Sequence, residues 1–217
     1  TVFNVLHTAA SCVAGLDLGF VPGEGGLDVA GMLTAAGRSE LEVVYLLGAD
    51  EIDMLALGKA FVVYQGSHGD AGAQRADVIL PGAAYTEKSA TYVSTEGRAQ
   101  VTSKAAFAPG DAKDDWAVLR ALSAHAGHTL PYDSLPALRA AMYKAAPVLS
   151  SLDAVTPAAL QGVEALAARG GVLGSVAFGT PVRDYYLTNP IARASAVMAE
   201  LAALRKSMSE GTTGTHG

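Results

Sequence analysis

Three short apolar runs, each closed by glycine or by proline and glycine, constrain the fold of this chain most strongly. They are residues 43–47 before Gly48, residues 61–65 before Gly66, and residues 77–80 before Pro81 and Gly82. An uninterrupted apolar run of this kind is typical of a parallel-sheet strand that is buried on both faces. The pattern therefore predicts an α/β fold with a Rossmann-like, mostly parallel sheet and helices on both faces.

Helical periodicity and capping residues predict the elements around this sheet. The expected helices cover residues 2–13, 27–36, a stretch from Asp111 or Asp114 to Ala126, 134–145 and 157–169, with a last one starting near Pro190. Gly15 and Gly19 are expected to stop the first helix. Asn189 stands in the position of an N-cap for the last helix, and Arg205 and Lys206 suit its carboxyl end.

A β-hairpin is expected between residues 90 and 103, where two β-compatible segments flank Glu96 and Gly97. Beyond residue 130 the sequence has few strand signals, and this part is expected to be a mainly helical appendage. The predicted organisation is an α/β domain at residues 1–130 with the hairpin as an insertion, a helical appendage at 131–210, and a flexible tail at 211–217.

Composition limits the classes of function. Of the 217 residues, 50 % are hydrophobic and 17 % charged, which is enough for a sizeable core. The net charge of -6 gives no general attraction for nucleic acid, and residues 1–16, the longest uncharged stretch, fall short of the roughly 20 apolar residues of a membrane-spanning helix. The single cysteine, Cys12, excludes an internal disulfide and the usual four-thiolate zinc or iron–sulfur sites.

His68 and Asp70 are the strongest candidates for acid–base chemistry. They follow a predicted parallel strand, where open α/β sheets bind their ligands, and Asp70 could orient His68 as a general base. The alternative is a loop histidine held by turn hydrogen bonds, which is favoured because no nucleophile motif accompanies it.

Other candidate sites are weaker. The glycine-rich loop at residues 22–26 lacks the spacing of a nucleotide fingerprint, and its Glu24 would repel phosphate. His7 and Cys12 point in different directions on a helix, so Cys12 is expected to be a small buried thiol. His125 and His128 flank a helix end, where they are expected to satisfy terminal carbonyl groups.

The residues Glu87, Lys88, Glu96, Gly97 and Arg98 form a charged motif beside the hairpin in a charge-poor region. Paired acids there could act as general acid and base, but cross-strand ion pairs that fix the register are favoured. Arg98 in particular is expected to form a buried pair with a carboxylate near the hairpin.

A family resemblance extends this interpretation. Its main segments are YQGSHGD at 64–70, ADVILPGAAYTEKSATYV at 76–93 and TEGRAQ at 95–100, with matches at 115–116, 119–123, 129–132, 184–189, 191–195 and 198–199. Together they resemble the C-terminal region of the large iron–sulfur subunit of NADH:quinone oxidoreductase (respiratory complex I). One departure is Ser94, where the family pattern usually carries asparagine, which puts a local side-chain bond in doubt.

The resemblance implies a molybdopterin oxidoreductase-like domain that has lost its cofactor. It also implies that 2Fe–2S and 4Fe–4S clusters are bound by cysteines in an N-terminal region of the subunit, outside this chain. Since the sequence begins at Thr1, we expect a piece of a longer protein. No residue of the chain is assigned a catalytic, cofactor-binding or metal-binding role, and the charged motif is assigned a structural one.

The expected function is a structural segment that supports electron flow from NADH to quinone within an enzyme, without a redox centre or catalytic role of its own. The expected partners are other hydrophilic-arm subunits, with neither nucleic acid nor direct membrane insertion. The expected location is the peripheral arm, on the cytoplasmic face of a bacterial inner membrane or the mitochondrial matrix face. The alternatives are the cofactor-binding domain of an active molybdopterin oxidoreductase and an isolated enzyme that uses His68 and Asp70.

The last helix carries two apolar stripes. Val197, Leu201, Leu204 and Met208 follow i, i+4, i+7, i+11 spacing, and a second stripe contains Ile191, Ala194 and Met198. The surface is wider than one shallow contact requires, so the helix could pack within its own domain or dock on another complex I subunit.

Overall fold

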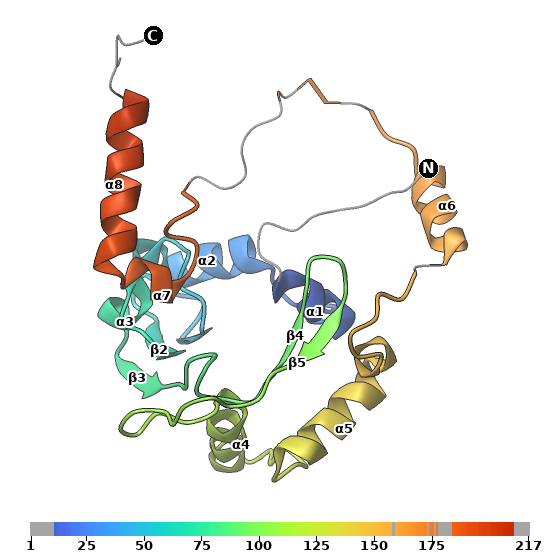
Figure 1. The fold of residues 1–217 in the computed structure, drawn as a ribbon, viewed down its shortest axis with the longest axis horizontal. Coiled ribbons are helices and arrows are strands. Elements are labelled where there is room, and N and C mark those ends of the chain that lie inside the picture. Colours follow the sequence, from blue (N-terminus) through green and yellow to red (C-terminus); the bar gives the residue numbers. More distant parts are fainter. Residues whose placement is uncertain (1–10, 158, 173, 176, 178–183, 211–217) are drawn as a thin grey trace. The chain divides into compact units, whose positions relative to one another are not determined.

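The computed structural model describes residues 11–210 except 158, 173, 176 and 178–183 (Figure 1). The chain forms two units, neither of them continuous in sequence. The parallel-sheet unit contains residues 22–88, 105–129 and 182–217, and the hairpin unit contains residues 1–21, 89–104 and 130–181. One switch between units falls between Thr129 and Leu130, beside the predicted domain boundary, but the division into domains at 1–130 and 131–210 stays a prediction.

The parallel-sheet unit is built on three strands in the order β1-β2-β3. Strands β1 (Val43–Leu47), β2 (Phe61–Gly66) and β3 (Val78–Pro81) pair in parallel, with Val44 opposite Val62 and Tyr64 opposite Ile79. The three apolar runs are therefore confirmed as neighbouring parallel strands.

One face of this sheet carries the core of the unit. Helix α2 (Val29–Gly37), the 3₁₀ helix η1 (Met54–Leu57) and helix α3 (Ala71–Arg75) supply residues that pack on it. The buried core residues are Leu46, Leu57, Val62 and Tyr64. Helix α2 begins where expected because the Asp28 side chain accepts a hydrogen bond from the Gly31 amide at 2.8 Å.

The opposite face is less covered. Side chains alternate along a strand, so Val43, Leu47 and Phe61 point away from the core, and they are 59, 47 and 48 % exposed. The expectation that these runs are buried on both faces is wrong at these positions. The start of helix α4 (Asp115–His125) covers this face at its carboxyl end, where Gln65 is fully buried, but the strand starts remain open.

The predicted last helix is two helices, α7 (Pro190–Arg193) and α8 (Ala196–Glu210). The Asn189 side chain caps α7 by accepting from the Ala192 amide at 2.9 Å, as expected. The interruption has a local cause. The Ser195 side chain accepts from the Met198 amide at 3.4 Å and its carbonyl accepts from the Ala199 amide at 3.0 Å, so Ser195 caps a new helix.

The hairpin unit contains the expected antiparallel pair, β4 (Thr91–Val93) and β5 (Ala99–Val101). Gly97 has a φ of +85°, a conformation that favours glycine in the connecting turn. The Ser94 hydroxyl accepts from the Glu96 and Arg98 amides, both at 3.3 Å. The serine thus makes the local side-chain bond that its replacement of asparagine had put in doubt.

Helices complete the hairpin unit: α1 (Ser11–Asp17), α5 (Leu135–Ala145), the 3₁₀ helix η2 (Pro147–Ser150) and α6 (Leu160–Ala168). Its buried core contains Val93, Ala99, Ala146 and Leu149. Gly15 lies inside α1 instead of stopping it; the helix ends at Asp17, before Gly19 with φ +69°. Residues 2–10 of that predicted helix and the tail at 211–217 lie outside the described residues.

Candidate functional site

The carboxyl ends of β1 and β2 bring acidic residues together around one arginine of α7. Arg193 Nη2 lies 3.0 Å from Asp50 Oδ1 and 3.1 Å from Glu51 Oε1, and Arg193 Nε contacts Asp70 Oδ2. Arg193 Nη1 also donates to the Leu187 carbonyl at 3.4 Å. We call this set of four charged side chains the Arg193 cluster.

Local structure explains why two of these carboxylates take fixed positions. Asp70 caps α3 through Oδ1, which accepts from the Ala71 amide at 2.9 Å. Asp50 Oδ2 accepts from the Gly72 amide at 3.2 Å. A Cβ at position 72 would lie 2.7 Å from the Tyr64 ring and 2.9 Å from Asp50 Cβ, so this approach requires glycine. Each carboxylate therefore bonds to α3 with one oxygen and to Arg193 with the other.

The cluster is partly shielded from solvent, which strengthens its electrostatic interactions. The Asp50 side chain is 2 % exposed and that of Arg193 is 22 % exposed. The hydrogen bond from Arg193 holds the pKa of Asp70 below its ordinary value. Burial by itself would lower the pKa of Arg193, but the bonds to Asp70 and Glu51 outweigh it and raise that pKa. Arg193 and Asp70 are therefore both held in their charged forms.

The charge balance of the Arg193 cluster disfavours anions. Three carboxylates surround one guanidinium group, so two formal negative charges remain uncompensated. This is the edge at which open α/β sheets bind ligands, commonly through phosphate groups. Here the same edge offers negative charge, and its cation is already engaged by the chain itself.

His68 does not form the acid–base pair proposed from the sequence. Its Nδ1 lies 3.0 Å from the Ser67 hydroxyl oxygen, and its backbone carbonyl accepts from the Tyr64 hydroxyl at 2.9 Å. Burial, followed by the nearby Asp50 charge, raises the pKa of Tyr64, so this hydroxyl stays a donor. The expectation that Asp70 orients His68 is wrong, because Asp70 caps α3 and binds Arg193.

A second polar chain crosses the opposite face of the sheet near its carboxyl end. The Tyr45 hydroxyl donates to Gln65 Oε1, Gln65 Nε2 donates to Asp115 Oδ1 at 2.9 Å, and Lys88 Nζ pairs with Asp115 Oδ2. Gln65 is fully buried, so both partners of its amide are needed. Burial and the Asp115 charge raise the pKa of Tyr45, which keeps its hydroxyl protonated.

The remaining charged residues beside the hairpin make local bonds. Glu87 Oε2 accepts from the Ala84 amide at 2.9 Å within the same turn. Arg98 Nη2 lies 3.6 Å from Glu96 Oε2, but the two side chains are 38 and 65 % exposed. Arg98 also donates to the backbone carbonyl of Asp153. The expected carboxylate partner of Arg98 is thus present, whereas the expected burial of that pair is wrong because both residues stand at an open turn.

The weaker sequence candidates show no arrangement for chemistry in the part of the chain that the structure describes. Gly26 donates to the Gly23 carbonyl at 2.9 Å, which makes residues 22–26 an ordinary turn. Cys12 is exposed, contrary to expectation, because α1 packs through Val13 and Ala14. His7 lies outside the described residues. His125 is in the last turn of α4, and the backbone amide of His128 donates to the Ser123 carbonyl.

The same described residues offer neither a metal site nor a membrane span. No group of three or more histidine, cysteine or acidic side chains among them is arranged to hold a metal ion. None of the described helices combines the length and the apolar character that crossing a bilayer requires.

Arg193 is the residue that sequence reasoning missed. It lies 142 and 123 positions from Glu51 and Asp70, and no periodic pattern links such distant residues. One signal was available, since Arg193 belongs to the segment 191–195 that carries part of the family resemblance. Figure 1 shows how the fold places α7 beside α3, and only this arrangement joins the arginine to the acidic residues.

Comparison with known families defines the class of protein. The molybdopterin oxidoreductase family model matches residues 1–125, more than half of the chain, and the chain therefore belongs to that family. A second model, for the C-terminal part of a large NADH-ubiquinone oxidoreductase subunit, matches residues 154–201. The resemblance to the large iron–sulfur subunit of complex I stated from the sequence is thereby confirmed.

Individual relatives narrow the comparison. The chain is 42 % identical over 210 residues to the mitochondrial 78 kDa subunit of NADH-ubiquinone oxidoreductase from Neurospora crassa, covering 94 % of this chain and 27 % of that protein. It is 42 % identical over 204 residues to the 75 kDa subunit from Reclinomonas americana, covering 94 % and 29 %. The iron-sulfur protein 1 of NADH dehydrogenase from Solanum tuberosum is 44 % identical over 207 residues, covering 94 % and 26 %. The chain thus spans little more than a quarter of these relatives.

The family implies a molybdopterin group, and the Arg193 cluster allows a test of whether the residues fit it. Such a group carries phosphate, which needs amide or cationic donors at the carboxyl edge of the sheet. The edge in this chain presents Asp50, Glu51 and Asp70, and the Arg193 guanidinium is engaged by all three. These residues do not fit a phosphate-bearing cofactor, and we derive no chemistry through one.

Proposed function

We propose that this chain is a structural segment of the large, electron-transferring iron–sulfur subunit of proton-translocating NADH:quinone oxidoreductase. In this proposal it supports electron flow from NADH to quinone as part of an enzyme, while the segment itself is non-catalytic and binds no redox centre. The 2Fe–2S and 4Fe–4S clusters of the enzyme lie in other parts of the subunit. Its partners are other subunits of the hydrophilic arm, on the cytoplasmic face of a bacterial inner membrane or the mitochondrial matrix face.

One observation carries the proposal. In a chain 42 % identical to a complex I subunit, the carboxyl edge of the parallel sheet is filled by Arg193 and its three carboxylates. A side chain that neutralises buried acids stabilises the fold, and it also occupies the position in which a ligand would bind. Catalytic, cofactor-binding and metal-binding residues are accordingly absent from the proposal, and Glu87, Lys88, Glu96, Gly97 and Arg98 keep a structural role.

The test uses the assembled enzyme with Arg193→Gln and, as a matched control, Arg98→Gln. We expect Arg193→Gln to reduce the amount of assembled enzyme on native gels while NADH:quinone turnover per assembled enzyme stays at the wild-type value. Arg98→Gln should change neither quantity. Normal assembly with lost turnover would instead assign Arg193 a direct part in the reaction and contradict the structural role.

The match of residues 1–125 to the molybdopterin oxidoreductase family favours a second candidate, the cofactor-binding domain of an active molybdopterin oxidoreductase. Molybdenum and pterin analysis of the purified protein separates the two. Stoichiometric molybdenum with pterin would support the second candidate. A metal-free, pterin-free product with normal NADH:quinone activity would support the first.

A further inference from the structure

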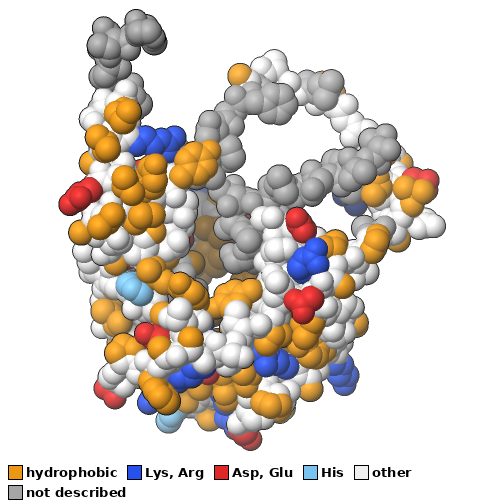
Figure 2. All heavy atoms as spheres, in the orientation of Figure 1, with side chains coloured by type: hydrophobic (Ala, Val, Ile, Leu, Met, Phe, Trp, Pro, Cys, Tyr) orange, Lys and Arg blue, Asp and Glu red, His pale blue; other side chains and the backbone are white. Residues whose placement is uncertain are grey.

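Helix α8 presents an apolar stripe that the described contacts of its unit do not cover. Val197, Leu201, Leu204 and Met208 are 63, 37, 56 and 65 % exposed. The helix packs on its unit through another side, where Ala202 is 9 % exposed and Met198 is half-buried. In Figure 2, apolar side chains follow the length of α8 on the face in view.

The spacing of this stripe indicates what kind of surface it fits. Steps of four, three and four residues place the stripe at successive a and d positions of a heptad repeat, the pattern by which one helix packs against another. A strand or an irregular loop would not match side chains that recur every 3.5 residues on average. The complementary surface is therefore the apolar face of a helix.

Charges flank the stripe on both sides and add a second requirement. In the heptad frame, Glu200 occupies a g position and Arg205 an e position, the positions that select partners in helix pairs. The Arg205 guanidinium carbon lies 5.1 Å from the centre of the Tyr185 ring, which holds it beside the stripe. A complementary helix carries a basic residue opposite Glu200 and an acidic residue opposite Arg205.

The size of the stripe argues against a second copy of this chain. Helix α8 has 15 residues, whereas coiled coils recognisable by pattern extend over about three to four heptads or more. Two heptads do not hold a pair together alone, so the partner must be held near α8 by other contacts as well. That condition is met between subunits of a larger assembly.

We infer that α8 is a docking surface for an amphipathic helix of another subunit, with an apolar a/d stripe and charges opposite in sign to Glu200 and Arg205. This inference rests on the proposed function, because a structural segment acts through the surfaces that it offers to its assembly. Residues 197, 201, 204 and 208 form the contact, and Glu200 and Arg205 select the partner and its direction.

The first test uses the chain and designed helical peptides with leucine at a and d. One peptide places lysine opposite Glu200 and glutamate opposite Arg205, and a second has these charges exchanged. By fluorescence anisotropy we expect the first peptide to bind about tenfold more tightly than the second, since like charges repel across an interface. The double variant Glu200→Lys with Arg205→Glu should reverse this preference, and an unchanged preference would overturn the charge assignment.

A matched pair of variants tests the stripe. Leu204→Asp should abolish peptide binding, whereas Ala203→Asp, which adds the same charge to an exposed position outside the stripe, should leave it intact. Equal Tm values for the two variants support docking. A much lower Tm for Leu204→Asp alone would show that the stripe packs inside this chain, and concentration-dependent dimers abolished by Leu204→Asp would make a second copy the occupant; both results overturn the inference.

In the intact enzyme, a photo-reactive amino acid at position 204 should cross-link to a helical segment of another subunit, and one at position 203 should not. Cross-links that return only to this chain would overturn the inference. This outcome is distinct from failure of the proposed function, since molybdenum and pterin content do not depend on α8.

Discussion

Each unit of this molecule contains an arginine that binds a carboxylate, and the two arginines differ in what they connect. In the parallel-sheet unit, Arg193 joins residues more than a hundred positions apart and is the counter-charge of Asp50, whose side chain is 2 % exposed. In the hairpin unit, Arg98 pairs with Glu96, two positions away at an exposed turn. The first contact fixes the tertiary arrangement of its unit, whereas the second supports a turn that glycine already specifies.

The largest effect should come from Arg193→Ala. Removing one partner of a shielded ion pair leaves Asp50 charged without its counter-charge, which costs about 3 kcal/mol. Trp116, the single tryptophan of the chain, lies in the parallel-sheet unit, so urea unfolding followed by its fluorescence reports this loss. Stability within about 0.5 kcal/mol of wild type, the range of an ordinary surface substitution, would remove the distinction between the two arginines.

The next effect tests whether burial, more than charge, distinguishes the parallel-sheet unit. Gln65→Leu leaves the Tyr45 hydroxyl and Asp115 without their buried amide partner, which should cost about 2 kcal/mol. Tyr45→Phe removes one bond from the same chain and should cost about 1 kcal/mol. The Trp116 unfolding curve measures both variants, and an equal loss in the two would mean that Gln65 needs only one partner.

Acid should act on the Arg193 cluster through Asp70. The pKa of Asp70 is lower in the folded chain than in the unfolded one, so its contribution is complete above the unfolded pKa of about 4 and is lost as the pH falls through the folded pKa. Asp70→Asn should therefore lower stability at pH 7 and flatten the acid loss between about pH 5 and 2. Parallel stability curves for wild type and variant over that range would contradict this linkage.

The smallest effects belong to the hairpin unit. Arg98→Ala breaks an exposed pair and should cost less than about 1 kcal/mol. Ser94→Ala removes two long bonds to turn amides and should cost about 0.5 to 1 kcal/mol, and Ser94→Asn should restore them. Circular dichroism during thermal unfolding measures these changes, and a loss at Arg98 as large as that at Arg193 would reverse the comparison.

Local signals made most secondary structure predictable. The three parallel strands, the hairpin turn at Gly97 and the caps at Asp28 and Asn189 depend on a few neighbouring residues, and each stands where the sequence placed it. The break at Ser195 was missed because a serine inside an apolar helical pattern has no strong signal unless its side chain turns back to the amides.

The candidate site was predictable only in its location. Sequence reasoning found the carboxyl edge of β2 and named Asp70, because parallel strands expose their functional loops there. It assigned Asp70 to His68, two positions away, since a neighbour in sequence was the visible partner. Arg193 and Asp50 meet Asp70 through tertiary contacts alone, and no propensity or spacing encodes such a meeting.

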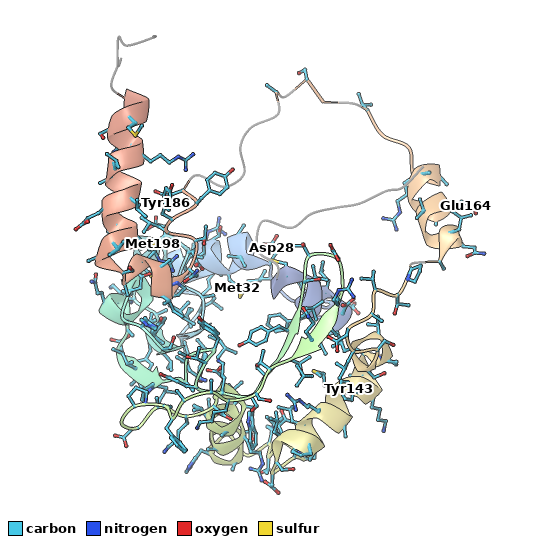
Figure 3. The ribbon with its side chains drawn as sticks, viewed as in Figure 1. Asp28, Met32, Tyr143, Glu164, Tyr186 and Met198 are labelled. Atoms are coloured by element: carbon cyan, nitrogen blue, oxygen red, sulfur yellow. The ribbon has the colours of Figure 1, made fainter. Side chains whose placement is uncertain are left out.

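The uncovered face of the parallel sheet determines how this chain behaves before it has partners. Val43, Phe61 and Val78 lie on adjacent strands of that face and are 59, 48 and 39 % exposed; Figure 3 shows the side chains of this region as sticks. Apolar surface of this kind adheres to other nascent chains, and β1 and β3, as edge strands of the described sheet, add open backbone groups. Recovery of the free chain from cells is therefore governed by a race between aggregation and capture by chaperones or partner subunits, and co-expression with the proteins that cover this face should improve yield more than any change to the buffer.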